Sequence, residues 1–335
     1  MDNLCHSLVG AAMSGAGLRR RTGLATVTLV LGANLPDADA LLYLFEDGTS
    51  ALAFRRGWTH GLLAMAVLPA LLAVVMVGVG RLLERRRARL RRPTGRIPIR
   101  PAQLLLLAAL SVWTHPLLDL LNTYGVRLLM PFSGRWFYGD ALFIVDPWVW
   151  LALGIGATIS LRRARAVPVG AGTATVMRRV ERPARIALSA VAIYIVAMAA
   201  SSVLGRVVVE RQARAAGGAP AQRVMVAPEP VQPFTRDVVR DLGDAYEVGR
   251  LTWSVPPRYV SSRAPFANGL ARAPAREAAR DPHARDFLSW SRFPYADVSA
   301  AGDSVRFEDA RYAVPGQMRW AGVSVPLPSP ATDSR

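Results

Sequence analysis

Histidine and aspartate side chains in apolar surroundings are the residues of this chain best suited to chemistry. Three of its four histidines lie in or beside apolar segments, together with three aspartates: His6, His60, His115, Asp37, Asp39 and Asp119. Ionisable groups are costly in such surroundings, so their presence indicates a functional site. Imidazole nitrogen and carboxylate oxygen together suit zinc or a similar divalent ion. The sequence therefore predicts a metal site formed by His and Asp residues.

The spacing of His115 and Asp119 supports this interpretation. Residues four apart share one face of a helix, and Asn122 extends the same polar stripe. Pro116 directly after His115 predicts that the helix begins or kinks there, and Pro36 predicts a similar break before Asp37. Broken helices at membrane depth are tolerated where they line a cavity. Both breaks are thus expected beside the site.

Long apolar segments must position these side chains. A span needs about 20 mostly apolar residues. The predicted spans are 23–45, 61–80, 102–124, 141–161 and 186–205, the first of them interrupted from Pro36 to Asp39. The segment 4–18 is too short to cross unless tilted, so we expect a half-span or an interfacial helix. The predicted fold is an all-α membrane domain with about five transmembrane helices and a short N-terminal apolar helix.

The basic residues indicate how these spans are oriented. The formal net charge is +17 and 52% of the residues are hydrophobic, with arginine gathered between the apolar runs. This segregation favours a membrane protein over a nucleic-acid-binding one. The segment 81–100 holds nine Arg, and 162–185 holds seven. With 19–21, these segments are expected on the cytoplasmic side of a bacterial inner membrane, because positive loops stay inside. The start of the chain lacks signal-peptide features, so we expect insertion through its own spans.

This topology places all the candidate residues at one depth. His60 precedes a span whose far end reaches the arginines that begin at Arg81. His115 and Asp119 lie in the outer half of the span that leaves Arg100, and the other candidates fall in the outer half by the same reasoning. The loop charges alone did not require the candidate residues to share one depth. Their agreement is therefore the strongest argument for a single site.

The C-terminal part of the chain has a different character. No apolar span follows residue 205, and proline and charged residues become more frequent. We expect a linker over 206–233 and a small β-containing domain over 234–335, outside the cytoplasmic membrane. Mixed β-branched, aromatic and polar residues at 246–255 and 304–314 predict short strands.

Several residues have simpler interpretations. Asp146 before Pro147 is typical of a helix N-cap. Cys5, the one cysteine, is more often a packing residue than a soft ligand. His283 is expected on the surface of the tail. A pair of aspartates is also found in proton or ion paths of transporters.

Several runs of residues resemble the YdjM-like inner-membrane proteins, described as membrane-bound metal-dependent hydrolases. The runs are Met1-Asp2-Asn3-Leu4-Cys5-His6-Ser7-Leu8, Leu35-Pro36-Asp37-Ala38-Asp39, Arg56-Gly57-Trp58-Thr59-His60-Gly61, His115-Pro116-Leu117-Leu118-Asp119, and the stretch from Asn122 through Pro131 to Trp148. The ordered set is specific, although each motif alone is weak. The resemblance covers about residues 1–205 and implies a membrane-embedded metal-dependent hydrolase domain there.

That family in turn resembles the zinc-dependent phospholipase C and single-strand nuclease group. Those enzymes hold zinc with ligands in the order His, Asp, His, His-x-x-x-Asp. The resemblance implies the ligands His6, Asp37 or Asp39, His60, His115 and Asp119 in this chain. The further His and Glu ligands of the soluble group are missing, since no histidine occurs between 115 and 283. One or two Zn²⁺ ions are therefore expected, with Asp140 and Asp146 as the nearest substitute ligands.

These considerations predict a hydrolase that uses metal-activated water on a phosphoester or related bond. Whichever of Asp37 and Asp39 is not a tight ligand would be the general base. Arg56, expected on the outer rim, would stabilise an anionic substrate. The depth of the site indicates a lipid or lipid-linked substrate. The alternatives are a metal-binding membrane protein without turnover and an ion- or proton-coupled transporter, for which we find no inverted repeat.

Overall fold

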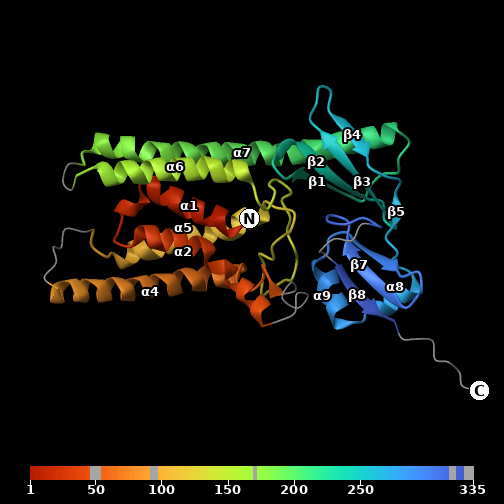
Figure 1. Ribbon diagram of the computed structural model, residues 1–335, viewed down its shortest axis with the longest axis horizontal. Helices are drawn as coiled ribbons and strands as arrows, with labels where there is room; N and C mark the ends of the chain where they lie inside the picture. The colour runs from red at the N-terminus through yellow and green to blue at the C-terminus, as the bar shows by residue number, and fades with distance from the viewer. Residues whose placement is uncertain (46–53, 91–96, 169–171, 317–321, 328–335) are drawn as a thin grey trace, which may run out of the picture. The chain divides into compact units, whose positions relative to one another are not determined.

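The computed structural model describes residues 1–45, 54–90, 97–168, 172–316 and 322–327. The chain divides into two compact units, Met1–Asp39 with Arg56–Ala200 and Ala40–Arg55 with Ser201–Arg335. The first unit is helical, and the second contains the β-sheets (Figure 1). The prediction of a helical region followed by a β-containing one is confirmed.

The helical unit is a bundle with short helices between longer ones. Figure 1 shows α1, α2 and α5 between α4 on one side and α6 with α7 on the other. The helices are α1 (Asn3–Gly15), η1 (Leu18–Arg20), α2 (Ala25–Asn34), η2 (Leu35–Leu44), α4 (Leu62–Arg89), α5 (Pro101–Leu120), α6 (Pro147–Ala166) and α7 (Ala174–Ala215). One core joins α1, α2, α6 and α7 through residues such as Val9, Leu29, Leu153 and Val191. A second core joins α4 to α5 through Leu72 and Leu104.

Two glycines allow the inner helices to approach closely. A Cβ atom on Gly10 of α1 would lie 2.6 Å from the carbonyl oxygen of Leu29 in α2. A Cβ atom on Gly32 of α2 would lie 2.1 Å from Oγ of Ser111 in α5. Both distances are too short for any side chain, so glycine is required where α2 contacts its neighbours.

The expectation of about five spans is not supported by the described residues. Among the described residues, three helices are long and apolar enough to cross a membrane: α4, α5 and α7. The expected span 23–45 is divided, because α2 ends at Asn34 just before Pro36 and a 3₁₀ segment follows. The expected span 141–161 is shortened, because α6 begins only at Pro147 and carries arginines in its last turn.

The second unit holds two antiparallel sheets. One sheet contains β1 (Arg223–Glu229), β2 (Gln232–Asp241), β3 (Ala245–Thr252) and β4 (Arg258–Ser261) in that order, with β5 (Phe266–Ala267) paired to β3. The other contains β6 (Pro294–Val298), β7 (Ser304–Asp309) and β8 (Gly322–Pro326). The short helices α8 (Ala273–Ala278) and α9 (Pro282–Trp290) lie between them in the chain. The strands expected at 246–255 and 304–314 correspond to β3 and β7.

The stretch expected as a linker, 206–233, is regular structure instead. It contains the end of α7 and all of β1. Val209 of α7 packs with Val226, Val238 and Leu251 from the first sheet in a buried cluster. Apolar burial on both elements explains why this stretch is ordered.

A buried carboxylate connects the second sheet to the end of α9. Asp309 accepts hydrogen bonds from the Ser291 hydroxyl, from the amides of Arg292 and Phe293, and from the buried Arg311 guanidinium at 2.9 Å. Burial by itself would raise the pKa of Asp309, but Arg311 and these donors hold it below its ordinary value. The ionised carboxylate is therefore a structural element of this unit.

Replacing Asp309 with Asn should destabilise the second unit by about 3–5 kcal/mol, because the buried Arg311 loses its counter-charge. A depressed folded pKa gives stability that is present above the unfolded value, about 3.9, and is lost as the pH falls through the folded pKa. Hydrogen exchange of the β6 and β7 amides in the full chain measures both effects. Asp297→Asn, at an exposed position on β6, is the control and should leave exchange unchanged. Equal exchange in Asp309→Asn and wild type would contradict the assignment.

Candidate metal centre

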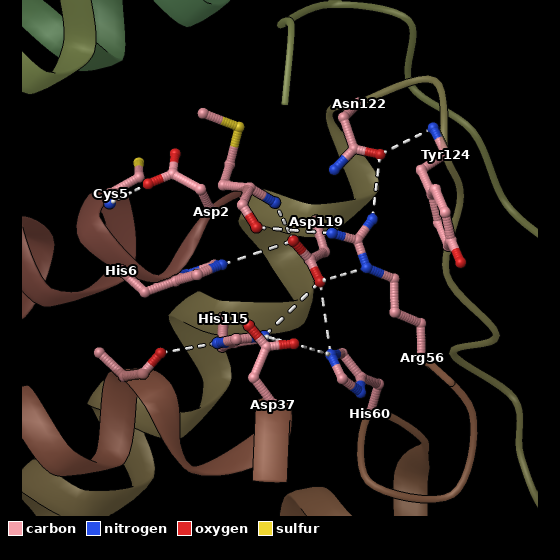
Figure 2. A network of polar contacts seen from close by, with 12 residues as sticks. Asp2, Cys5, His6, Asp37, Arg56, His60, His115, Asp119, Asn122 and Tyr124 are labelled. Atoms are coloured by element: carbon pink, nitrogen blue, oxygen red, sulfur yellow. Dashed lines mark hydrogen bonds and ion pairs between the residues drawn. The ribbon is translucent and has the colours of Figure 1, made fainter. Parts of the chain in front are cut away.

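Four buried side chains from three places in the sequence meet in the helical unit. Asp37 lies just after the break that ends α2, His60 just before α4, and His115 and Asp119 one turn apart on α5 (Figure 2). One donor atom from each lies within 4.8 Å of all the others. The expected helical spacing of His115 and Asp119 is thus confirmed, and both side chains point into the same group.

The distances between these donors fit a small divalent ion. Nε2 of His60 lies 3.4 Å from Asp119 Oδ2 and 3.9 Å from Asp37 Oδ1. Nε2 of His115 lies 3.5 Å and 3.6 Å from the same two oxygens. Two ligands bound at about 2.0–2.1 Å to one tetrahedral zinc ion lie roughly 3.3 Å apart. The donor set therefore needs only a small contraction to surround an ion.

A hydrogen bond at Nδ1 of His115 determines that the other ring nitrogen, Nε2, faces the three other donors. Nδ1 of His115 donates a hydrogen bond of 2.6 Å to the carbonyl oxygen of Ala33, at the end of α2. Nε2 is buried and has no hydrogen-bond partner within the described part of the chain. A ring nitrogen that carries its proton on the far side presents a lone pair at the other nitrogen, as metal-binding histidines do.

His60 is oriented through Thr59 and Asp39. The Thr59 hydroxyl donates its proton to Asp39 Oδ2 at 2.8 Å. The hydroxyl oxygen lies 2.9 Å from His60 Nδ1 and therefore accepts a hydrogen bond from the N–H group at Nδ1. Asp39 Oδ2 also accepts from the amide of Arg56. Burial lowers the pKa of His60, which favours the neutral imidazole that binds metal. Asp39 thus lies one step outside the four-donor group, behind His60.

Arg56 lies inside the cluster and not on an exposed rim, as the sequence had led us to expect. Its residue surface is only 4% exposed, and Nε lies 3.1 Å from Asp119 Oδ2. Nη1 donates to the Asn122 side-chain oxygen and to the Gly125 carbonyl, and the guanidinium lies over the Tyr124 ring. These contacts fix the position of Asp119, so Arg56 is a positioning residue in this geometry.

His6 packs against the group from α1. Its ring stacks on His115 with centroids 3.7 Å apart, and Nε2 lies 3.5 Å from Asp119 Oδ1. Both ring nitrogens are buried, and neither has a hydrogen-bond partner in the residues that the structure describes. The Met1 amino group also contacts Asp119 Oδ1. His6 therefore adjoins the four donors without belonging to the group within 4.8 Å.

The family model of the YdjM inner membrane proteins matches residues 1–204. The chain belongs to the YdjM inner membrane protein family. Membership places it in the inner membrane and in contact with the lipid bilayer. The match includes every residue of the cluster and leaves out most of the β-containing unit. No curated protein and no solved structure matches the chain.

The structure also locates the residues considered as substitute ligands, Asp140 and Asp146, and those given simpler interpretations. Asp146 is the N-cap of α6, where it accepts from the amides of Trp148 and Val149 and from the Tyr194 hydroxyl. Neither Asp146 nor Asp140 belongs to the donor group found among the described residues. Cys5 is buried in the core of the bundle, and His283 is exposed on α9. The interpretations of Asp146 as a cap and Cys5 as a packing residue are confirmed.

Thr59 links Asp39 to His60, a contact that the sequence did not predict. Its position directly before His60 was the available signal, but a hydroxyl beside a histidine has no specific spacing. The contact with Asp39 depends on the loop conformation at Arg56, whose φ of 51° no sequence pattern predicts.

Replacing Thr59 with Val should weaken metal binding about 10–100-fold, because partners that orient a metal-binding histidine have effects of this size. Valine keeps the shape and removes the hydroxyl between Asp39 and His60. The measurement is metal affinity by competition with a chelator. Thr59→Ser keeps the hydroxyl and should bind like wild type. A Thr59→Val protein with unchanged affinity would show that this hydrogen-bonded connection does not orient His60.

Proposed function

We propose that this YdjM-family chain is a membrane-bound metal-dependent hydrolase that cleaves a phosphoester or related bond of a lipid or lipid-linked substrate. The observation that carries the proposal is the convergence of two imidazole nitrogens and two carboxylate oxygens, with both imidazoles fixed from behind. Such preorganised donors are typical of sites that hold a metal in a defined geometry.

The donor types favour Zn²⁺ or a similar ion, with Asp37, His60, His115 and Asp119 as ligands. A divalent ion bound there would supply a Lewis acid and lower the pKa of a coordinated water. His6 and Asp119 Oδ1 lie beside the group, and we assign a second ion, where one is bound, to this side.

The chain's own residues are assigned distinct tasks. Asp37, at 6% exposure, is more exposed than the three other donors, so we assign it the contact with water or substrate. Asp39 and Thr59 orient His60, and Arg56 orients Asp119. A general base must lie within hydrogen-bond reach of the proton it removes. Asp39 is outside the donor group, but its carboxylate is already engaged behind His60. We therefore retain Asp37 as the general base, although it is also a donor: it would bind the ion through Oδ1, the oxygen that faces His60 and His115, and accept the proton at Oδ2.

Membership of an inner membrane family and the position of the donors on a candidate span support a lipid or lipid-linked substrate. Two of the donors, His115 and Asp119, are part of α5, a candidate span. A substrate that reaches them must enter an apolar environment, which lipids and lipid-linked molecules already occupy. The arginine-rich segment 81–100 between α4 and α5 favours a site toward the outer leaflet, at the opposite ends of these two helices. A tail outside the cytoplasm requires that α6 also crosses the membrane, which would leave the arginines of 162–185 on the cytoplasmic side.

Hydrolysis assays on the full chain in lipid nanodiscs test the proposal. A panel of phospholipids and lipid-linked phosphoesters should include at least one that is cleaved by the metal-loaded protein. Dialysis against a chelator should abolish cleavage, and added Zn²⁺ should restore it. Asp37→Asn, which keeps the shape of the side chain, should lose most activity. Cleavage that persists in metal-free protein would contradict the proposal.

The burial of the donors favours a second candidate, a metal that stabilises the bundle without turnover. His60, His115 and Asp119 are all completely buried. A structural ion would raise stability by about 2.7 kcal/mol at a free concentration about 100 times its Kd. Full metal occupancy, a stability gain of this size and no cleavage across the panel would select this candidate over the hydrolase.

A further inference from the structure

The helical unit also contains a cavity, at the arginine-rich ends of its helices. It is a cavity of about 700 Å³ between the start of α2, the last turns of α4 and residues 97–99. Leu24, Val27, Leu83 and Ile99 contribute an apolar lining, and Arg19 and Arg87 contribute positive charge. The lining contains none of the metal donors, so this cavity is separate from the site above.

Arg19 shares its nearest acidic neighbour, Glu181, with two other arginines. Its two terminal nitrogens are shielded from solvent and have no hydrogen-bond partner in the described ranges. The carboxylate of Glu181 is paired with Arg20 at 2.9 Å and with Arg185 at 2.6 Å. Terminal guanidinium nitrogens that are shielded from water and make no hydrogen bond are costly, and an anion in the cavity would accept those hydrogen bonds.

The start of α2 adds further donors to the same cavity. The N-cap residue Leu24 has a φ of 62°, and α2 has no side-chain cap. The amides of Ala25, Thr26 and Val27 lie in the first turn, where a helix offers no internal acceptors, and all three residues line the cavity. Uncapped amides and the helix dipole both favour a negatively charged group.

We propose that this cavity binds an anionic phospholipid, with its phosphate at Arg19, Arg87 and the start of α2. The lining has two arginines against one acidic residue, the exposed Glu84. The apolar side chains beside them offer a surface for an acyl chain, which a free phosphate would leave uncovered. Basic groups at the predicted cytoplasmic ends of spans attract anionic lipids of that leaflet.

Native mass spectrometry of the full chain in detergent tests this assignment. With equal amounts of phosphatidylglycerol and phosphatidylcholine, wild type should retain one phosphatidylglycerol and little phosphatidylcholine. The double variant Arg19→Gln/Arg87→Gln should retain at least about 10-fold less, because charged hydrogen bonds contribute about 1.5–3 kcal/mol each. Arg21→Gln/Arg86→Gln removes the same charge from exposed positions outside the lining and should behave like wild type.

A second variant keeps the test decisive if the double variant folds poorly. Ala88→Trp fills part of the cavity from an exposed position and keeps both arginines. It should also lose the lipid, while its metal content stays at the wild-type level. Equal retention of the two lipids by wild type, equal loss in both arginine pairs, or full lipid retention in Ala88→Trp would each overturn the proposal.

Discussion

His115→Ala is expected to remove metal from the protein and to abolish any hydrolase activity. Nε2 of His115 lies 3.6 Å from Asp37 and 3.5 Å from Asp119, and the ring stacks on His6. Mutation of a residue that only hydrogen-bonds to a metal ligand already lowers the metal affinity about 10–100-fold. Loss of a direct ligand should therefore cost more than about 100-fold.

Metal content of the purified full chain is the measurement. His283→Ala is the matched control, because it removes a histidine that is exposed on α9. Stoichiometric metal should remain in that control and disappear in His115→Ala. An ion count near one in both proteins would remove the basis of the metal centre.

Asp119→Asn is expected to lower both stability and metal affinity, for two separable reasons. Asn has nearly the same shape but no charge, so the buried Arg56 loses its counter-charge at 3.1 Å. Leaving one partner of a buried ion pair alone typically costs about 3–5 kcal/mol. The same change removes a carboxylate that lies within 3.5 Å of His6, His60 and His115.

A double variant separates the two effects. Arg56→Met/Asp119→Asn removes the charge of Arg56 as well, so the thermal unfolding of the detergent-solubilised protein should recover the part of the stability that the unpaired Arg56 had cost. The part lost at the Met1 amino group, which also contacts Asp119, should not recover. Metal affinity should stay low in the double variant, because the missing carboxylate is not replaced. Recovery of metal binding together with stability would show that Asp119 serves the fold and not the ion.

The sequence located the cluster because its signals were local or topological. His115 and Asp119 share a helix face at a spacing of four, and the arginines at the ends of the apolar segments predicted one shared depth for the candidate residues. Neither signal depends on side-chain conformation. The different positions of Asp37 and Asp39 do depend on side-chain conformation. The two residues are two apart in sequence, but Asp37 belongs to the donor group and Asp39 lies behind His60.

The span count failed where two sequence signals competed. Asp146 and Pro147 predicted a helix start, while the apolar run 141–161 predicted a span through the same position. The cap prevailed, since its carboxylate satisfies amides at the start of α6 and Pro147 fits the first turn. Hydropathy counts residues and does not register where a helix begins.

The first strand of the tail was missed for a compositional reason. Its surroundings are rich in proline and small residues, which resembles a linker. The short run Val224–Val226 is nevertheless enough to pair with β2 in register and to bury Met225 and Val226. A run this short carries no reliable period, so tertiary pairing decides its structure.

The contact between His115 and Ala33 makes the ion sensitive to the spacing of two helices. Gly32 touches Ser111, and one residue further along α2 the Ala33 carbonyl accepts from His115, one turn beyond Ser111 on α5. Any change that pushes α2 away from α5 would break the hydrogen bond that orients His115 and would also move Asp37, which follows the end of α2. If an ion is bound there, we expect its affinity to fall when a substitution between α2 and α5 widens their spacing, even where that substitution touches no donor.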